Sequence, residues 1–206
     1  MKYYFIFFVF LINLTSICEA RSKFLLVLGP SGVGKSTIIN QLKILDDRFE
    51  YISPLTTRDL REGEDDKIHV SEDTMDQLEA QGSLLTKNYI YGIYYGTPKK
   101  TICDALDNEF FPVLDWPVSK IDIMKSHFKD RLLCVYIFPP NIESLADRLA
   151  VDGRDENGLR FQSGVSELSE FEKGNFDNII DLKIESTKND SKTIAKQIYS
   201  WYLKNI

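Results

Sequence analysis

One stretch near the start of this 206-residue chain constrains its fold more than any other: residues 23–37, which read KFLLVLGPSGVGKST. Within it, Gly29, Gly34, Lys35 and Ser36 fit the pattern G-x-x-x-x-G-K-[ST], a loop that surrounds phosphate groups. The glycines permit a tight turn whose backbone N–H groups point inward at phosphate oxygens. The stretch therefore predicts a phosphate-binding loop.

The residues on either side of this loop supply the context that the pattern requires. Residues 24–28 form an apolar run that is typical of a buried parallel strand. After the loop, apolar residues recur at helical spacing, at Ile38, Ile39, Leu42 and Leu45. A helix that opens at Lys35 adds the positive end of its dipole to the loop. Strand, loop and helix in this order predict a nucleoside triphosphate site.

Each predicted role in the loop follows from the chemistry of its side chain. Lys35 supplies a full positive charge for the outer phosphates, and Ser36 supplies a hydroxyl for Mg²⁺, the expected cofactor. Asp115 ends a later buried strand, where an open parallel sheet places ligand-facing residues, and is the second predicted metal ligand. The predicted ATP-binding residues are Gly29, Ser31, Gly32, Val33, Gly34, Lys35, Ser36 and Thr37.

Composition limits the class of protein. With 206 residues and 43% hydrophobic content, the chain is long enough for one α/β domain and short for two. The net charge of −6 argues against a general nucleic-acid binder, so no nucleic-acid partner is expected. Three cysteines and two histidines show neither paired nor metal-ligand spacing, which argues against a disulfide framework and a zinc site.

Residues 1–20 differ from the rest and have the layout of a secretory signal peptide: Lys2, an apolar run over residues 3–12, and a small residue, Ala20, at the end. The run is short for a transmembrane span, which needs about 20 apolar residues. Three interpretations stay open: a signal or targeting peptide, an upstream extension from a misassigned start, and a membrane-associating tail. The first predicts export or targeting and the second a cytoplasmic protein. The globular domain is expected over residues 21–206, without a transmembrane span.

The remaining pattern alternates strands with helices. Buried strands are predicted at 49–53, 110–116, 132–138 and 176–182, and helices at 121–128, 166–173 and 191–203, after Ser71 and after Asn141. Residues 84–95 suggest strands of a small mixed sheet outside the main one. We therefore predict a three-layer α/β/α fold with a parallel sheet, an acceptor-binding insertion at about 51–97 and a lid at about 148–162.

Arginines outside the loop are candidates for further phosphate contacts. Arg58 and Arg61 lie three apart on an irregular segment and can converge on one phosphate as planar forks of donors. Arg148, Arg154 and Arg160 surround a polar stretch with two glycines that suits a lid closing over a transferring phosphoryl group. The alternative for both segments is a solvated charged loop.

Taken together, these residues resemble the guanylate kinase family over nearly the whole chain from Arg21 onward. Residues 29–37 look like its phosphate loop, and the run 56–58 with Arg61, Gly63 and Glu64 looks like its monophosphate-binding signature. The triplet 95–97 is similar to the family's tyrosine-glycine-hydroxyl triplet. The resemblance implies an ATP:monophosphate phosphotransferase whose catalytic residues are Lys35, Arg148 and Arg154 and whose acceptor-binding residues are Arg58, Arg61, Tyr95 and Thr97.

The sequence departs from the family pattern where the family reads the acceptor's base. Pro54 stands where the family usually has a serine, Thr86 where a glutamate reads guanine, and Pro117 where a second aspartate follows the strand. A site built to hydrogen-bond a base loses discrimination steeply when its acceptors are absent. The acceptor is therefore expected to be GMP or a related nucleoside monophosphate, without strict guanine selectivity.

Two other functions stay open. The short segment 66–72 and residues 153–157 resemble the ribose 1,5-bisphosphate phosphokinases, which share the fold and accept a sugar phosphate. Non-catalytic guanylate kinase-like modules bind protein partners, but they typically lose the loop residues that Lys35 and Ser36 retain here. The main expectation is an enzyme with small-molecule substrates, ATP and a monophosphate acceptor, acting as a monomer or homodimer.

Overall fold

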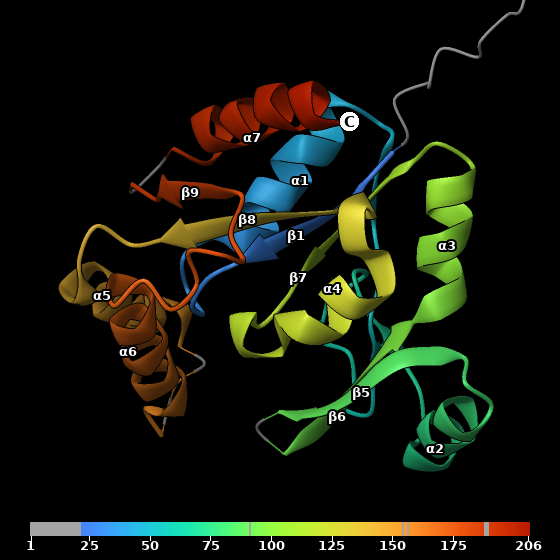
Figure 1. Cartoon of the computed structure of the whole chain (residues 1–206). Helices are drawn as coiled ribbons and strands as arrows, with labels where there is room; N and C mark the ends of the chain where they lie inside the picture. Colours follow the sequence, from blue (N-terminus) through green and yellow to red (C-terminus); the bar gives the residue numbers. More distant parts are fainter. Residues whose placement is uncertain (1–21, 91, 154, 156, 188–189) are drawn as a thin grey trace, which may run out of the picture.

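The computed structural model describes residues 22–206 except 91, 154, 156, 188 and 189. Five strands form the main sheet in the order β2-β7-β1-β8-β9, and every pairing between them is parallel (Figure 1). Their bounds are Phe49–Tyr51 (β2), Phe111–Asp115 (β7), Phe24–Leu28 (β1), Leu132–Phe138 (β8) and Leu182–Glu185 (β9). This confirms the predicted parallel α/β fold.

The central strand β1 is buried on both faces. Its five residues are all 0% exposed, and successive side chains point to opposite sides of the sheet. Leu25 and Val27 join one core cluster, while Phe24, Leu26 and Leu28 join another. The sheet is therefore the middle of three layers.

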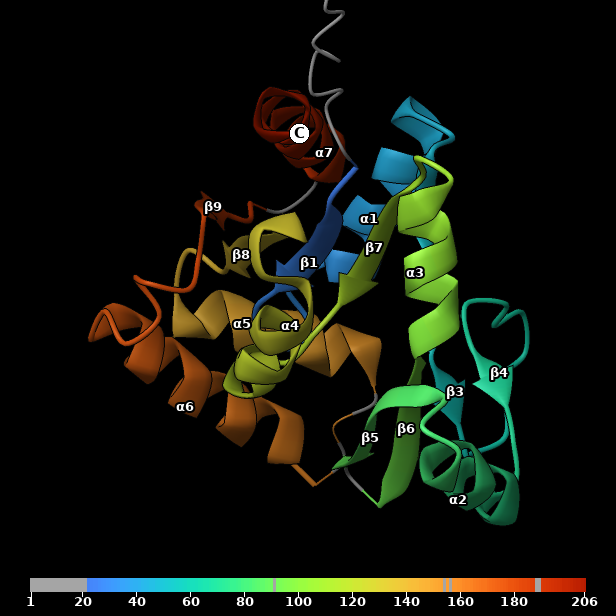
Figure 2. The same cartoon turned by 45° about the vertical axis from the view of Figure 1, so that its right-hand side comes forward.

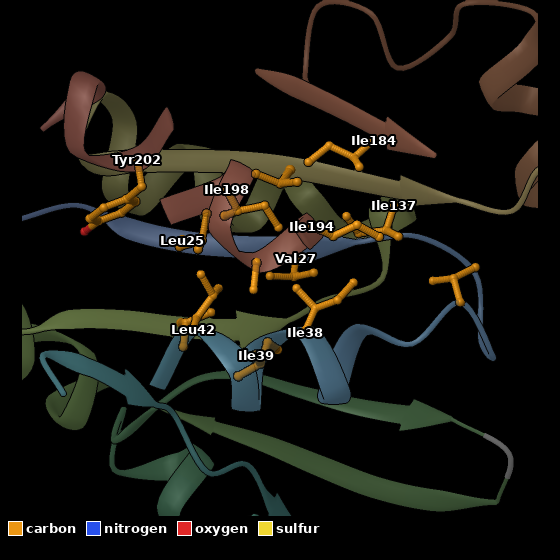
Figure 3. Close-up of a cluster of buried hydrophobic side chains, with 14 of the residues drawn as sticks. Leu25, Val27, Ile38, Ile39, Leu42, Ile137, Ile184, Ile194, Ile198 and Tyr202 are labelled. Atoms are coloured by element: carbon orange, nitrogen blue, oxygen red, sulfur yellow. The ribbon is translucent and has the colours of Figure 1, made fainter. Parts of the chain in front are cut away.

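Helices α1 (Lys35–Leu45) and α7 (Ser191–Asn205) cover the first face. Ile38 and Ile39 of α1 and Ile194 and Ile198 of α7 meet the side chains of β1 in one cluster (Figure 3). Leu45, at the end of α1, is 36% exposed and lies outside this cluster. Packing against α7 holds α1, and with it the phosphate-binding loop, against the sheet.

The opposite face is covered by α3 (Lys99–Asp107) and α4 (Ile121–Phe128). Helix α3 was not predicted from the sequence, although Ile102, Ala105 and Leu106 are buried at helical spacing. A short 3₁₀ turn, Val118–Lys120, leads into α4, and a second, Lys129–Arg131, follows it.

A second, mixed sheet lies beside the first and has the order β4-β3-β6-β5 (Figure 2). Its strands are Leu55–Thr56 (β3), Ile68–His69 (β4), Leu84–Ile90 (β5) and Ile93–Pro98 (β6), with helix α2 at Glu72–Ala80. Ser71 caps α2, since its hydroxyl accepts from the N–H of Thr74 at 3.1 Å, as predicted. The predicted mixed sheet outside the main one is confirmed.

Helices α5 (Ile142–Asp152) and α6 (Leu159–Glu172) lie beyond the carboxyl end of β8, across from the second sheet (Figures 1 and 2). The Asn141 side chain accepts from the N–H of Ser144 at 2.8 Å and so caps α5 as expected. No helix in the described part of the chain is long and apolar enough to span a membrane. The predicted leader, residues 1–20, lies outside the described residues.

Two predicted elements are corrected. The helix predicted at 166–173 begins at Leu159, because the Asp155 carboxylate accepts from the N–H groups of Arg160 and Phe161, at 2.8 and 2.9 Å, and caps an earlier start. The strand predicted at 176–182 is wrong: the chain turns there, with the N–H of Ile179 bonded to the Phe176 carbonyl at 2.9 Å. The last strand is β9, which begins at Leu182, where the predicted strand was expected to end.

Candidate active site

The phosphate-binding loop connects β1 to α1, as predicted. Gly29, Gly32 and Gly34 all have positive φ angles, of 128°, 90° and 94°. L residues with a side chain rarely adopt these angles, so the glycines give the loop its shape. The loop ends at the N-terminus of α1, where free N–H groups and the helix dipole favour a phosphate.

Gly29 also makes a close approach that no side chain would allow. A Cβ on Gly29 would lie 2.1 Å from the backbone carbonyl oxygen of Ile137 in β8, whereas one on Gly34 would meet nothing within 4 Å. We expect Gly29→Ala to lower the free energy of unfolding by about 3 kcal/mol or more, and Gly34→Ala by about 1 kcal/mol. Urea unfolding of both variants measures the difference. Equal losses would show that only backbone strain matters at Gly29.

The Lys35 ammonium lies on its own loop. It donates to the carbonyl oxygens of Gly29 and Pro30 at 2.7 and 2.9 Å. Burial lowers the pKa of Lys35, while the nearby carboxylates of Asp115 and Glu167 act in the opposite direction. Lys35 is therefore a weakly solvated cation at the base of the loop, within reach of any anion that binds there.

Arg58 is held by Glu64 in a fork-to-fork ion pair. Its two terminal nitrogens donate to the two carboxylate oxygens of Glu64 at 2.7 and 2.5 Å, and Glu64 also accepts from the backbone N–H of Arg61 at 3.1 Å. The hydrogen bonds to Glu64 raise the pKa of Arg58, and Tyr95 adds to this effect. Glu64 thus fixes the direction of a guanidinium whose side chain is only 14% exposed.

This pair predicts a dependence of stability on pH. The hydrogen bond from Arg58 lowers the pKa of Glu64 to about 2 from an ordinary value of 4.5. The folded form then releases the Glu64 proton more readily than the unfolded chain, so the stabilisation is complete above about pH 4.5. We expect up to about 3 kcal/mol to be lost as the pH falls from 4.5 to 2. Urea unfolding between pH 7 and 3 should show a smaller loss for Glu64→Gln, and an equal loss would contradict this assignment.

Ser36 and Asp115 are the predicted metal ligands, and both line the cavity described below. Asp115 ends β7 and accepts from the hydroxyl of Tyr51 at 2.8 Å. Burial, and next the Asp115 charge, raise the pKa of Tyr51, so this hydroxyl stays a donor. Mg²⁺ prefers oxygen ligands and is usually held by one or two protein oxygens plus substrate phosphates. A hydroxyl and a carboxylate fit that requirement.

Arg148 and Arg160 approach the loop from α5 and α6. Arg148 donates to the Ser186 hydroxyl and carbonyl at 2.8 and 2.9 Å, and to the Val33 carbonyl at 3.4 Å. Arg160 donates to the Asp152 carboxylate at 2.7 Å and to the hydroxyl of Ser31. The predicted lid range, about 148–162, thus includes the end of α5 and the start of α6. Arg154, the third predicted catalytic residue, lies outside the described residues.

These groups come together in one cavity of about 940 Å³, between the second sheet and helices α5 and α6. Its wall includes most of the predicted site residues: Ser31, Gly32, Gly34, Lys35, Ser36, Thr37, Arg58, Arg61, Tyr95, Thr97, Asp115 and Arg148. Two predicted ATP-binding residues do not line it. Gly29 contributes its carbonyl to Lys35, and the Val33 side chain is buried in the core. The phosphate-binding loop and the arginines of the predicted acceptor site, Arg58 and Arg61, thus line the same cavity.

Comparison with known proteins decides the family. A model of the guanylate kinase family matches residues 21–197. The guanylate kinase of Ruegeria sp. (strain TM1040) is 30% identical over 189 residues, covering 87% of this chain and 85% of that protein. The chain belongs to the guanylate kinase family. The guanylate kinase of Clostridium acetobutylicum is 31% identical over 181 residues, covering 84% of this chain and 85% of that protein.

Solved structures agree with the fold of the guanylate kinase family. The crystal structure of guanylate kinase from Anaplasma phagocytophilum has a TM-score of 0.67 at 20% identity and covers 89% of this chain and 85% of that one. Shikimate kinase from Acinetobacter baumannii has a TM-score of 0.51 at 15% identity, covering 89% and 94%. At these identities the likeness concerns the fold. Family membership confirms that the chain is a phosphotransferase.

Some cavity residues of this guanylate kinase-family chain were not predicted. Arg160, whose part in the lid the sequence left open, reaches the loop, and Tyr51 and Asn88 also line the wall. Tyr51 has no motif around it, and its role depends on Asp115, which is 64 residues away. Asn88 lies two residues after Thr86 on β5, so the period of a strand could have placed both on one face.

Proposed function

We propose that the chain transfers the γ-phosphoryl group of ATP to GMP with the help of Mg²⁺. The observation that supports this most is the single cavity that contains Lys35 and the loop on one side and Arg58, Arg61 and Tyr95 on the other. Two separate clusters of phosphate-binding groups suit a donor and an acceptor that both carry phosphates. A cavity of about 940 Å³ is large enough for both reacting ends.

On the donor side, the loop N–H groups and the α1 N-terminus would hold the phosphates of ATP. Lys35 would leave the carbonyls of Gly29 and Pro30, to which it now donates, and turn its flexible stem toward the β- and γ-phosphates. Exchanging two neutral carbonyls for anionic oxygens strengthens its hydrogen bonds. Ser36 and Asp115 would hold Mg²⁺, which would supply positive charge to the phosphates of bound ATP.

On the acceptor side, Arg58, Arg61 and Tyr95 would bind the monophosphate. Glu64 aims the Arg58 fork, and the Arg61 side chain is exposed at the cavity wall. Planar guanidinium groups bind phosphate oxygens in pairs and so fix its orientation. The acceptor oxygen would then point toward the loop.

Transfer needs position and charge rather than covalent help from the protein. The transition state spreads negative charge over three equatorial oxygens, and fixed cations near these oxygens lower its energy. Lys35, Arg148 and Arg160 are the described cations on the loop side of the cavity. Arg160 already donates to Ser31 of the loop, so a small movement of α5 and α6 would bring both arginines to the phosphates.

The test is release of ADP by the full-length chain with ATP, Mg²⁺ and one of six acceptors: GMP, dGMP, AMP, CMP, UMP or ribose 1,5-bisphosphate. We expect turnover with GMP. Turnover with the sugar bisphosphate alone would contradict the proposal. ATP binding without turnover on every acceptor would instead indicate a non-catalytic binding module.

A further inference from the structure

A chain of four hydrogen-bonded polar side chains includes two residues that line the cavity, Asn88 and Thr97. On the second sheet, Thr86 pairs with Thr97 across the strands, and Asn88 pairs with Tyr95. The side chains of these two cross-strand pairs therefore lie on one face of the sheet. Thr86, Asn88 and Thr97 are at most 8% exposed, and Asn88 and Thr97 line the cavity. The fourth member of the chain is Lys120, at the end of the 3₁₀ turn before α4.

The hydrogen bonds in this chain all run in one direction. Lys120 Nζ donates to Asn88 Oδ1 at 2.7 Å, and Asn88 Nδ2 donates to Thr86 Oγ1 at 3.3 Å. The Thr86 hydroxyl then donates to Thr97 Oγ1 at 3.1 Å. A lysine ammonium has donors and no acceptor, so only the oxygen of Asn88 can face it. Lys120 therefore sets the orientation of the amide, whose N–H donates to Thr86.

The last member of this chain presents a donor to the cavity. Thr97 accepts from Thr86, so its own hydroxyl proton is available to a ligand. Asn88 uses one N–H and one lone pair within the chain, which leaves one of each. Asn88 thus offers the cavity one donor and one acceptor of a neutral amide, and Thr97 adds a hydroxyl donor.

The carboxylates of the cavity wall lie outside the second sheet, at the ends of β7 and α5. Among the described residues of the wall, the acidic ones are Asp115 and Asp152. Asp115 is bonded to Tyr51 and lies near Lys35, and Asp152 is paired with Arg160, which reaches the loop. The described wall also contains Tyr95, which pairs with Asn88 across the strands, and the apolar residues Ile90, Ile93, Trp116 and Pro117. These can pack against a flat ring.

These groups select between the edges of the bases. A 6-oxopurine presents a carbonyl that accepts and a ring N–H that donates, which matches the donors of Thr97 and Asn88 and the free lone pair of Asn88. The 2-amino group distinguishes guanine from hypoxanthine, and its two N–H groups need further acceptors. The described wall residues that come from the second sheet provide no carboxylate for them. Adenine has an amino group in place of the carbonyl, which would oppose the Thr97 donor.

We propose that the chain Lys120–Asn88–Thr86–Thr97 reads the 6-oxo edge of the acceptor's base and leaves the 2-amino group unread. The acceptor class is then the 6-oxopurine nucleoside monophosphates, so inosine monophosphate (IMP) is used about as well as GMP, and AMP poorly. This inference rests on the proposed transfer to a nucleoside monophosphate and names its acceptor class.

The experiment measures kcat/KM of the full-length chain for GMP, IMP and AMP, and the Kd of each by titration calorimetry. We expect GMP and IMP to agree within about threefold and AMP to be at least about tenfold worse, which is the effect of one mismatched hydrogen-bonding group. A preference for GMP over IMP of thirtyfold or more would overturn the inference while leaving the proposed function intact. If no acceptor is turned over, the proposed function fails and the ratio of the Kd values decides the inference. Absence of binding by both GMP and IMP overturns both.

Two variants test which residues set the selectivity. Asn88→Asp keeps the size of the side chain and the acceptor for Lys120, and it adds a carboxylate that can accept from the ring N–H and the 2-amino group together. We expect the ratio of kcat/KM for GMP to kcat/KM for IMP, the GMP:IMP ratio, to rise at least about tenfold. Lys120→Met removes the donor that orients the amide, and the GMP:AMP ratio should fall at least about fivefold. Unchanged ratios in both variants would overturn the inference.

The matched control is Lys87→Met. Lys87 lies between Thr86 and Asn88 on β5, but its side chain points to the other face and pairs with Asp76 and Glu79 of α2. Its GMP:IMP and GMP:AMP ratios should equal those of the unchanged protein. A shift in the control as large as that in Asn88→Asp would attribute the selectivity to a general distortion of β5 and would also overturn the inference.

Discussion

Replacing Lys35 with alanine is expected to abolish phosphoryl transfer and leave a folded protein. Lys35 is the described cation at the base of the loop, and its ammonium can reach the phosphates from its present position on the Gly29 and Pro30 carbonyls. Removing such a charge from a transition state that carries negative charge costs about 10³-fold or more in kcat. The fold should persist, because the side chain donates only to loop carbonyls at a cavity that water can enter. ADP release with GMP and thermal unfolding measure the two effects.

Lys43→Ala is the matched control for this result. Lys43 lies on the same helix, in the last turn of α1, and is exposed. Its removal also changes the net charge by one unit, so any general electrostatic effect is shared. We expect its kcat to be unchanged. Lys35→Ala with more than a tenth of the original kcat, in a protein that unfolds normally, would exclude the proposed role of Lys35.

Replacing Arg58 with methionine is expected to lower kcat/KM for GMP by about 10²- to 10³-fold and to leave the affinity for ATP unchanged. The guanidinium offers a phosphate paired donors in a fixed plane, a geometry that methionine cannot replace. The Kd of ATP should stay the same because Arg58 belongs to the second sheet's side of the cavity rather than to the loop. Steady-state kinetics with GMP varied, and calorimetry with ATP, separate the two effects.

A loss of stability could imitate this effect, because Arg58→Met leaves the largely buried Glu64 carboxylate without its fork-to-fork partner. The double variant Arg58→Met, Glu64→Gln removes that charge as well, so it should unfold at a higher temperature than Arg58→Met alone. Its kcat/KM for GMP should stay low. Recovery of activity together with stability would mean that Arg58 holds the segment in place and does not bind the acceptor.

Much of the fold could be predicted because its signals are local. The loop motif with an apolar run before it and helical spacing after it predicted β1 and α1, and Ser71 and Asn141 predicted the starts of α2 and α5. The strand predicted at 176–182 was wrong because apolar residues there are buried although they belong to a turn. Ile180 is buried in the second core cluster from a turn, and this gave residues 176–182 the pattern of a strand.

The site was predicted to a different extent at its two ends. The residues expected to bind phosphate lie in sequence motifs, so Lys35, Arg58 and Tyr95 were found from the sequence. The contacts that orient other groups join residues far apart in the chain, and no sequence pattern records them. Tyr51 with Asp115 and Lys120 with Asn88 are such pairs, 64 and 32 residues apart. The departures at Pro54, Thr86 and Pro117 indicated that the base is read differently, but the residues that read it required the structure.

The most direct test of the account is the affinity of a bisubstrate compound in which adenosine and guanosine are joined through a chain of five phosphates. In the proposed arrangement, one cavity holds the donor's phosphates at the loop and the acceptor's phosphate at Arg58 and Arg61. A molecule that occupies both places at once should bind with a Kd about tenfold or more below that of ATP, because its second contact is intramolecular. It should also lose this advantage in Arg58→Met. A Kd equal to that of ATP, with GMP still able to bind beside it, would contradict this arrangement.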